Sequence, residues 1–231
     1  MTKILLVGLF SFLITCGLSQ PTDWGKKFSD AIVARYQPTI DAMTHHGWDH
    51  SNSIILHGME KIYTRTYNKS YLNYIKSFVD TFVSPDGSVK GLHPTLDGMH
   101  PGVLCLFLYE QTGQNKYKIA ATNIRNYIIG TANSPSAFNK TPDGGYWHKN
   151  DEHYKNVMTV DGAYMANPFL VRYGKLFHDE KSVDVATFQI LLVASHCFNP
   201  ETKLPYHRYG CLDPSTRKPD DNPIAFVTWT P

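Results

Sequence analysis

The stretch "PGVLCLFLYEQTGQNKYKIAATNIRNYI", residues Pro101–Ile128, decides the fold. Its first part, as far as Tyr109, is apolar at nearly every position, which is typical of a helix buried between other helices. A short polar turn follows. From Tyr117 onward, apolar residues recur every three or four positions, as they do on one face of a second helix. The stretch therefore predicts a helical hairpin.

The same plan recurs on either side of this hairpin. His57–Val79 also combines a glycine, a helix ending near a tyrosine, a polar turn and an amphipathic helix, and a looser copy runs from Asp161–Leu176 into Val183–His196. The matching tyrosines are Tyr63 and Tyr71 in one copy and Tyr109 and Tyr117 in the other. Phe188–Phe198 is apolar on nearly all sides and is expected to be a buried helix. Because strand-like alternation is scarce, the repeat predicts an all-α chain, either an open α-solenoid or a closed toroid of inner and outer helices.

The first residues are typical of a secretory signal peptide. Lys3 supplies a basic start, Ile4–Leu18 supplies an apolar core, and small residues precede Gln20 at a suitable cleavage position. The apolar run is short for a membrane-spanning helix. We therefore expect residues 1–19 to be removed and no membrane anchor to remain. Residues 20–231 would form one domain of a secreted or periplasmic protein.

The composition excludes some functions and leaves others open. A net charge of +2, with dispersed Lys and Arg, does not suggest a nucleic acid partner. Aromatic residues make up 13% of the chain, which fits either a sugar-holding cleft or a bulky core. The cysteines left after cleavage are odd in number and give no disulfide framework, although Cys197 and Cys211 could pair, while Cys105 is expected to be a small buried hydrophobe. The sequence leaves open whether the sequons at Asn68 and Asn139 are used.

Two acidic residues stand at matching places in the repeat. Asp97 and Asp161 each precede a glycine that opens an apolar helix. Either one alone is most simply an N-cap, since Asp before a helix accepts backbone N–H bonds and suits the helix dipole. As a pair at the same end of a hairpin array, they could instead face one cleft, as the carboxylates of glycosidases do. Burial among its apolar neighbours would favour the protonated form of Asp161, whereas capping would favour the ionised form.

Two groups of histidines stand out among the eleven. The first group comprises His45, His46, His50 and His57. Its spacing matches no zinc pattern, and these side chains are expected to be solvated or hydrogen-bonded. His148 in "GGYWHK" and His207 in "LPYHRYG" each follow an aromatic residue in a loop with glycine, as polar contacts in a sugar cleft often do. Nucleophile signatures such as G-x-S-x-G are absent, and we expect neither a metal nor a cofactor.

Four motifs carry a family resemblance: "LDGMHPG", "GGYWHK", "VDGAYMANPF" and "LPYHRYG". In this order, with helical hairpins between them, they resemble the unsaturated glucuronyl and rhamnogalacturonyl hydrolases, glycoside hydrolase families 88 and 105. The resemblance implies an (α/α)6 toroid. It also implies a reaction on the C4=C5 double bond that lyases leave on a terminal uronic acid, in which the bond is hydrated and the remaining sugar is then expelled.

The resemblance further implies roles for individual residues. Asp161 would be the general acid that protonates C4, and Asp97 the second catalytic acid, which holds sugar hydroxyls. The substrate-binding positions implied in the same way are His148, His207, Trp48, Trp147 and Met165. The substrate would be an unsaturated uronyl oligosaccharide from pectin (rhamnogalacturonan), with glycosaminoglycan-type disaccharides as the alternative.

The sequence departs from the family pattern in three places. The family usually has Trp at the position of Thr159 and Tyr at that of His50, so we expect one pocket wall and one hydroxyl contact to be lost. The chain also stops at Pro231, before a Trp- and Arg-rich segment of the family. We therefore expect an incomplete toroid with an exposed apolar helix face, from the N-terminal portion of such a hydrolase. A non-catalytic carbohydrate-binding relative and an α-solenoid interaction module are the alternatives.

Overall fold

The structure, a computed structural model, describes residues 22–210. Its elements are α1 (Trp24–Arg35), α2 (Asp41–Thr44), α3 (His50–Thr66), α4 (Lys69–Phe82), η1 (Asp97–Met99), α5 (Gly102–Thr112), α6 (Asn115–Ile129), η2 (Glu152–Tyr154), β1 (Met158–Thr159), α7 (Val160–Phe177), α8 (Glu180–Cys197) and β2 (Arg208–Tyr209). The chain is mainly helical, as the sequence predicts. The predicted signal peptide, residues 1–19, and Cys211, the predicted partner of Cys197, lie outside the described residues.

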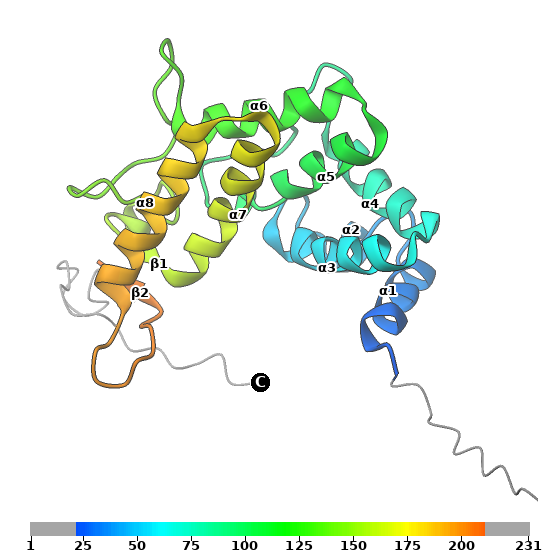
Figure 1. Ribbon diagram of the computed structural model, residues 1–231, viewed down its shortest axis with the longest axis horizontal. Helices are drawn as coiled ribbons and strands as arrows, with labels where there is room; N and C mark the ends of the chain where they lie inside the picture. The colour runs from blue at the N-terminus through cyan, green and yellow to red at the C-terminus, as the bar shows by residue number, and fades with distance from the viewer. Residues whose placement is uncertain (1–21, 211–231) are drawn as a thin grey trace, which may run out of the picture.

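Three helical hairpins follow one another along an arc (Figure 1). α3 pairs with α4, α5 with α6 and α7 with α8, while α3 also contacts α5 and α5 contacts α7. The turns begin with left-handed residues that end α3, α5 and α7, which are Tyr67, Gly113 and His178. The first helix of each hairpin contacts the first helix of the next hairpin, and each packs against the second helix of its own hairpin. This is the arrangement found in an α/α toroid. The predicted hairpin repeat is therefore confirmed.

Repeated tyrosines tie the second helix of two hairpins to earlier elements. Tyr71 on α4 and Tyr117 on α6 are fully buried, and each hydroxyl donates a hydrogen bond to a carboxylate, that of Asp30 on α1 and that of Asp80 on α4 respectively. The buried rings supply hydrophobic stabilisation, and the hydrogen bonds avoid the cost of burying an unpaired hydroxyl. This explains why the tyrosine recurs at the same place in the repeat.

α5 and α8 are both strongly apolar in sequence but differ in burial. Every residue from Gly102 to Leu108 of α5 is buried, as predicted. In α8, Phe188, Ile190 and Leu191 are exposed, Leu191 by 64%, so the prediction of a helix buried on all sides is wrong. Ile190 and residues of α7 line a groove of about 620 Å³. The exposed residues of α8 form an apolar helix face of the kind that the sequence predicts.

Within residues 22–210, none of the helices combines the length and the apolar character that crossing a membrane requires.

Two long loops between the hairpins are hydrogen-bonded to each other at one end of the array. The N–H of Leu96 donates to the carbonyl of His148 at 3.0 Å, and the N–H of His148 donates to the carbonyl of Val157 at 2.8 Å. The segment before η1 is therefore held beside the segment that leads into α7. This arrangement brings Asp97 and Asp161 to the same end of the helical array.

Candidate active site

Asp97 opens η1 and is buried, with its side chain only 9% exposed. Three basic groups surround its carboxylate: His148 Nε2 lies 3.3 Å and Lys149 Nζ 3.4 Å from Oδ2, and His50 Nδ1 lies 3.7 Å from Oδ1. Burial alone would raise the pKa of Asp97, but the hydrogen bond from His148 and the charges of His50 and Lys149 outweigh burial and hold this pKa below its ordinary value. Asp97 is therefore ionised at neutral pH.

Asp161 lies in the first turn of α7 and has a more open environment. Its side chain is 42% exposed, so the expectation of a buried carboxylate is wrong. The reason is that α7 directs its neighbours Gly162 and Met165 inward, while Asp161 stays at the rim. Its Oδ1 is shielded from solvent and receives no hydrogen bond from residues 22–210, although His207 Nε2 lies 3.4 Å away.

The two carboxylates and one histidine meet in a single cluster. One oxygen of Asp97, one oxygen of Asp161 and one ring nitrogen of His148 all lie within 4.8 Å of one another. Capping does not account for the two acids, because the N-caps of η1 and α7 are Leu96 and Thr159. The structure thus brings both acids to one place, as their matching positions in the repeat predict.

The same three groups are the one set of at least three potential metal ligands in residues 22–210. Carboxylate oxygens and an imidazole nitrogen suit several divalent cations. Here, however, Lys149 Nζ already lies 3.4 Å from Oδ2 of Asp97. A positive charge on Lys149 opposes a further cation nearby. The arrangement is better matched to proton transfer between side chains and a ligand.

A two-stranded ribbon carries His207 to the cluster from beyond α8. β1 pairs antiparallel with β2, and the N–H of Val160 donates to the carbonyl of His207 at 2.9 Å. These bonds fix the backbone of His207 over the first turn of α7. His207, which the resemblance places in the substrate pocket, is therefore a neighbour of Asp161.

Two of the other three side chains expected to bind substrate, Trp48 and Met165, lie in the hydrophobic core. Trp48 is only 2% exposed and stacks on Phe78, with ring centroids 6.2 Å apart and planes 4° from parallel. Met165 is buried in the same hydrophobic core. Trp147 is half-buried beside His148. The structure thus places Trp48 and Met165 in the core and not at the surface of a cleft.

Two neighbours of Asp97 were not predicted as site residues. Lys149 directly follows His148 in "GGYWHK", so a cation next to a predicted site residue was the available signal. His50 was expected to be solvated or hydrogen-bonded, and it does pair with Asp49, whose carboxylate lies 2.8 Å from Nδ1. This pairing outweighs burial and raises the pKa of His50, with further support from Asp97.

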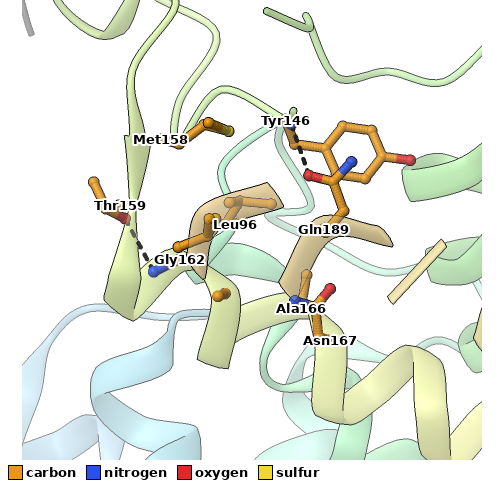
Figure 2. A pocket seen from close by; sticks show the side chains of 10 residues that line it. Leu96, Tyr146, Met158, Thr159, Gly162, Ala166, Asn167 and Gln189 are labelled. Carbon is orange, nitrogen blue, oxygen red and sulfur yellow. Dashed lines mark hydrogen bonds between the residues drawn. The ribbon is translucent and has the colours of Figure 1, made fainter. Parts of the chain in front are cut away.

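A small cavity lies behind the first turn of α7 (Figure 2). Leu96, Tyr146, Thr159 and Gly162 are among the residues that line it, and its volume of about 10 Å³ is close to that of a single water site. A sugar ring cannot enter this space. This cavity is therefore not a place where a sugar could bind.

A sequence profile of glycosyl hydrolase family 88 matches residues 24–220. The chain belongs to glycosyl hydrolase family 88. The family that the four motifs predict is thereby confirmed. This family 88 chain is 25% identical over 166 residues to the unsaturated rhamnogalacturonyl hydrolase YesR of Bacillus subtilis (strain 168), a match that covers 70% of this chain and 45% of YesR.

Solved structures show the same architecture. A family 105 glycoside hydrolase of C. acetobutylicum ATCC 824 is 29% identical with a TM-score of 0.70, covering 81% of this chain and 49% of that one. A possible family 105 member from Salmonella enterica subsp. enterica serovar Paratyphi A is 19% identical with a TM-score of 0.67, covering 83% and 54%, and supports the fold alone. The family 88 chain thus spans about half the length of the relatives it matches.

Proposed function

We propose that this family 88 chain is part of a hydrolase that removes the unsaturated uronic acid from lyase-generated rhamnogalacturonan oligosaccharides by hydrating its C4=C5 double bond. The similarity to an unsaturated rhamnogalacturonyl hydrolase supports the substrate class. The observation that carries the proposal is the close cluster of Asp97, Asp161 and His148, whose facing atoms lie within 4.8 Å of one another.

One oxygen of Asp97 lies within 4.8 Å of one oxygen of Asp161, so the two carboxylates can act on the same part of a ligand. A close pair in which one member is held ionised suits delivery of a proton and activation of water on one side of the ligand.

In the proposed reaction, Asp161 gives its proton to C4, and the electrons of the double bond form the new C–H bond. The positive charge that develops is shared by C5 and the ring oxygen, and the ionised Asp97 stabilises it. Water then adds to C5 and returns a proton to Asp161. The hemiketal opens to a ketone at C5, and C1 expels the remaining sugar. One water is consumed, and Asp161 ends in its starting state.

Loss of the ultraviolet absorbance of the C4=C5 chromophore tests the proposal. The folded chain is expected to bleach an unsaturated rhamnogalacturonan disaccharide, and Asp161→Asn to lower the rate about 100-fold or more, since it removes the proton donor. Asp184→Asn, which changes an exposed carboxylate on α8, is the matched control and is expected to behave as wild type. No bleaching by folded wild type would contradict the proposal, and bleaching only of glycosaminoglycan-type disaccharides would correct the substrate class.

A further inference from the structure

Thr159 is a buried residue, 4% exposed, where β1 runs into α7. Its Oγ1 accepts a hydrogen bond from the N–H of Gly162 at 2.9 Å and lies 2.8 Å from Nδ1 of His148. Figure 2 shows the Thr159 side chain directed at the amide of Gly162. One oxygen atom therefore joins the start of the helix that carries Asp161 to the histidine that faces Asp97.

The number of available hydrogens sets the direction of the bond between Thr159 and His148. On the far side of the ring, Nε2 lies 3.3 Å from Oδ2 of Asp97. The carboxylate of Asp97 is ionised and can only accept, so Nε2 carries a proton. In a neutral ring, Nδ1 is then bare and can only accept a hydrogen bond. The hydroxyl of Thr159 is therefore the donor, while one of its lone pairs receives the N–H of Gly162.

The opposite arrangement leaves a buried hydrogen without a partner. If Nδ1 of His148 carried a proton, Thr159 Oγ1 would have to accept from both His148 and Gly162. Its own O–H would then have no acceptor within residues 22–210, at the cost of an unmade hydrogen bond in a buried place.

We infer that Thr159 is a positioning residue that fixes His148 as the neutral tautomer, with its proton on Nε2 and directed at Asp97. His148 then supplies a hydrogen bond to Asp97 without adding a positive charge, and the negative charge of Asp97 stays available to a ligand. The assignment of the tautomer does not depend on the proposed function. Only the effect of the tautomer on catalysis rests on that function.

Gly162 explains how Thr159 and His148 can lie so close together at the start of α7. A Cβ at this position would lie 2.7 Å from Thr159 Oγ1 and 2.9 Å from His148 Nδ1, both shorter than real Cβ contacts. The glycine therefore leaves open the space in which the Thr159–His148 bond forms.

Nitrogen-15 NMR of the imidazole rings in the full chain tests the tautomer, with His148→Gln used to assign the His148 signals. Wild type and Thr159→Ser are expected to show a protonated Nε2 and a bare, hydrogen-bonded Nδ1. Thr159→Val, which has nearly the same shape but no hydroxyl, is expected to move the Nδ1 signal toward that of an unbonded nitrogen. A proton on Nδ1 in wild type, or identical His148 signals in wild type and folded Thr159→Val, would overturn the inference.

Two further readings keep this test independent of folding and of the proposed function. Thr159→Val also loses the cap of α7, and circular dichroism reports whether this variant is folded. If the variant is unfolded, the nitrogen-15 NMR spectrum of wild type alone decides the tautomer. With the disaccharide, Thr159→Val is expected to lower kcat about ten-fold with KM little changed, and Thr159→Ser to retain it. An unchanged kcat would remove the catalytic role, and inactivity of wild type would count against the proposed function alone.

Discussion

At the scale of residues, Asp97 and Asp161 differ in their surroundings and not in their chemistry. Asp97 is buried among basic groups that hold its pKa low. Asp161 is 42% exposed, with His207 as its nearest basic neighbour. The surroundings of Asp97 hold that carboxylate ionised, which suits it to stabilise positive charge. On this account, Asp161 meets the ligand and Asp97 stabilises the charge that forms.

Gly162→Ala tests how tightly the cluster is packed. The added methyl group would crowd Thr159 Oγ1, His148 Nδ1 and Leu96 Cδ1, at 2.7 to 2.9 Å. We expect the free energy of unfolding to fall by about 1–3 kcal/mol, as in other overpacked sites.

Gly58→Ala is the matched control for this change. Gly58 lies inside α3, and nothing comes within 4 Å of an added Cβ there. Because alanine favours the helix, we expect the free energy of unfolding to rise by about 0.5–1 kcal/mol. Urea denaturation of both variants measures the difference, and equal changes of the same sign would contradict the packing described around Gly162.

Sequence reasoning could predict which residues of the site meet but not how they are held. Asp97 and Asp161 each precede a helix of the repeat, so their meeting follows from the hairpin plan. The exposure of Asp161 does not, because apolar neighbours in sequence point to other faces of the same helix. The bond between Thr159 and His148 joins the two ends of an irregular loop, for which local periodicity gives no signal.

At the scale of elements, one arginine connects three helices. Arg172 on α7 pairs through Nη1 with both carboxylate oxygens of Glu60 on α3, at 2.9 and 3.1 Å, and through Nη2 with Glu110 on α5 at 2.6 Å. Glu60 is buried, and burial raises its pKa even though Arg172 and Lys61 oppose the shift. The network therefore joins the first helices of all three hairpins.

Arg172→Met would leave the buried Glu60 with only Lys61 nearby, 3.7 Å away. We expect the free energy of unfolding to fall by about 2–4 kcal/mol, because a buried carboxylate would lose its main partner. Lys175→Met, which changes an exposed cation on the same helix, should have little effect. Thermal and urea unfolding of the two variants measure this, and similar stabilities would show that Arg172 does not hold the helices together.

The sequence predicted the hairpins well and the smaller elements poorly. Repeated tyrosines and apolar periodicity mark α3 to α6, because the two hairpins bury the same kinds of side chain at the same positions. β1 and β2 have two residues each, too few for alternation to be recognised. The exposed face of α8 could not be predicted either, since apolar composition does not reveal whether a neighbour covers a helix.

At the scale of the whole molecule, the helical array is a scaffold that places loops at one end. α3, α5 and α7 set the spacing, and the loops after α4 and α6 supply Asp97 and His148. The four motifs lie in the segments after α4, α6 and α8 and in the first half of α7. How the toroid closes could not be derived from periodicity, and the chain spans about half the length of its relatives.

The whole molecule should lose stability in mild acid partly because of His100. This side chain is fully buried beside Ser53, and burial, with the charges of His57 and His50, lowers the pKa of His100 to about 4. In the unfolded chain, its pKa is about 6.5. Between these values the unfolded state binds the proton and the folded state does not, so stability falls as the pH drops from about 6.5 to about 4, by up to about 3 kcal/mol.

His100→Gln removes this titration and should make the unfolding free energy depend less steeply on pH over that range. Part of the dependence should remain, because burial also lowers the pKa of His57 to about 4. His46→Gln, which changes an exposed histidine, should retain the wild-type dependence. Urea denaturation at several pH values compares the three proteins. Parallel curves for wild type and His100→Gln would show that His100 is not held neutral in the fold.

The central claim is that this site protonates C4 of an unsaturated uronic acid, and turnover in D2O tests it most directly. The account predicts that NMR of the product, recorded early, shows one deuterium on C4 and no remaining double bond. Product made in H2O and then placed in D2O controls for later exchange. Release of the uronic acid with its C4=C5 bond intact and no deuterium on C4 would contradict the account, since it would mean direct attack on the glycosidic bond.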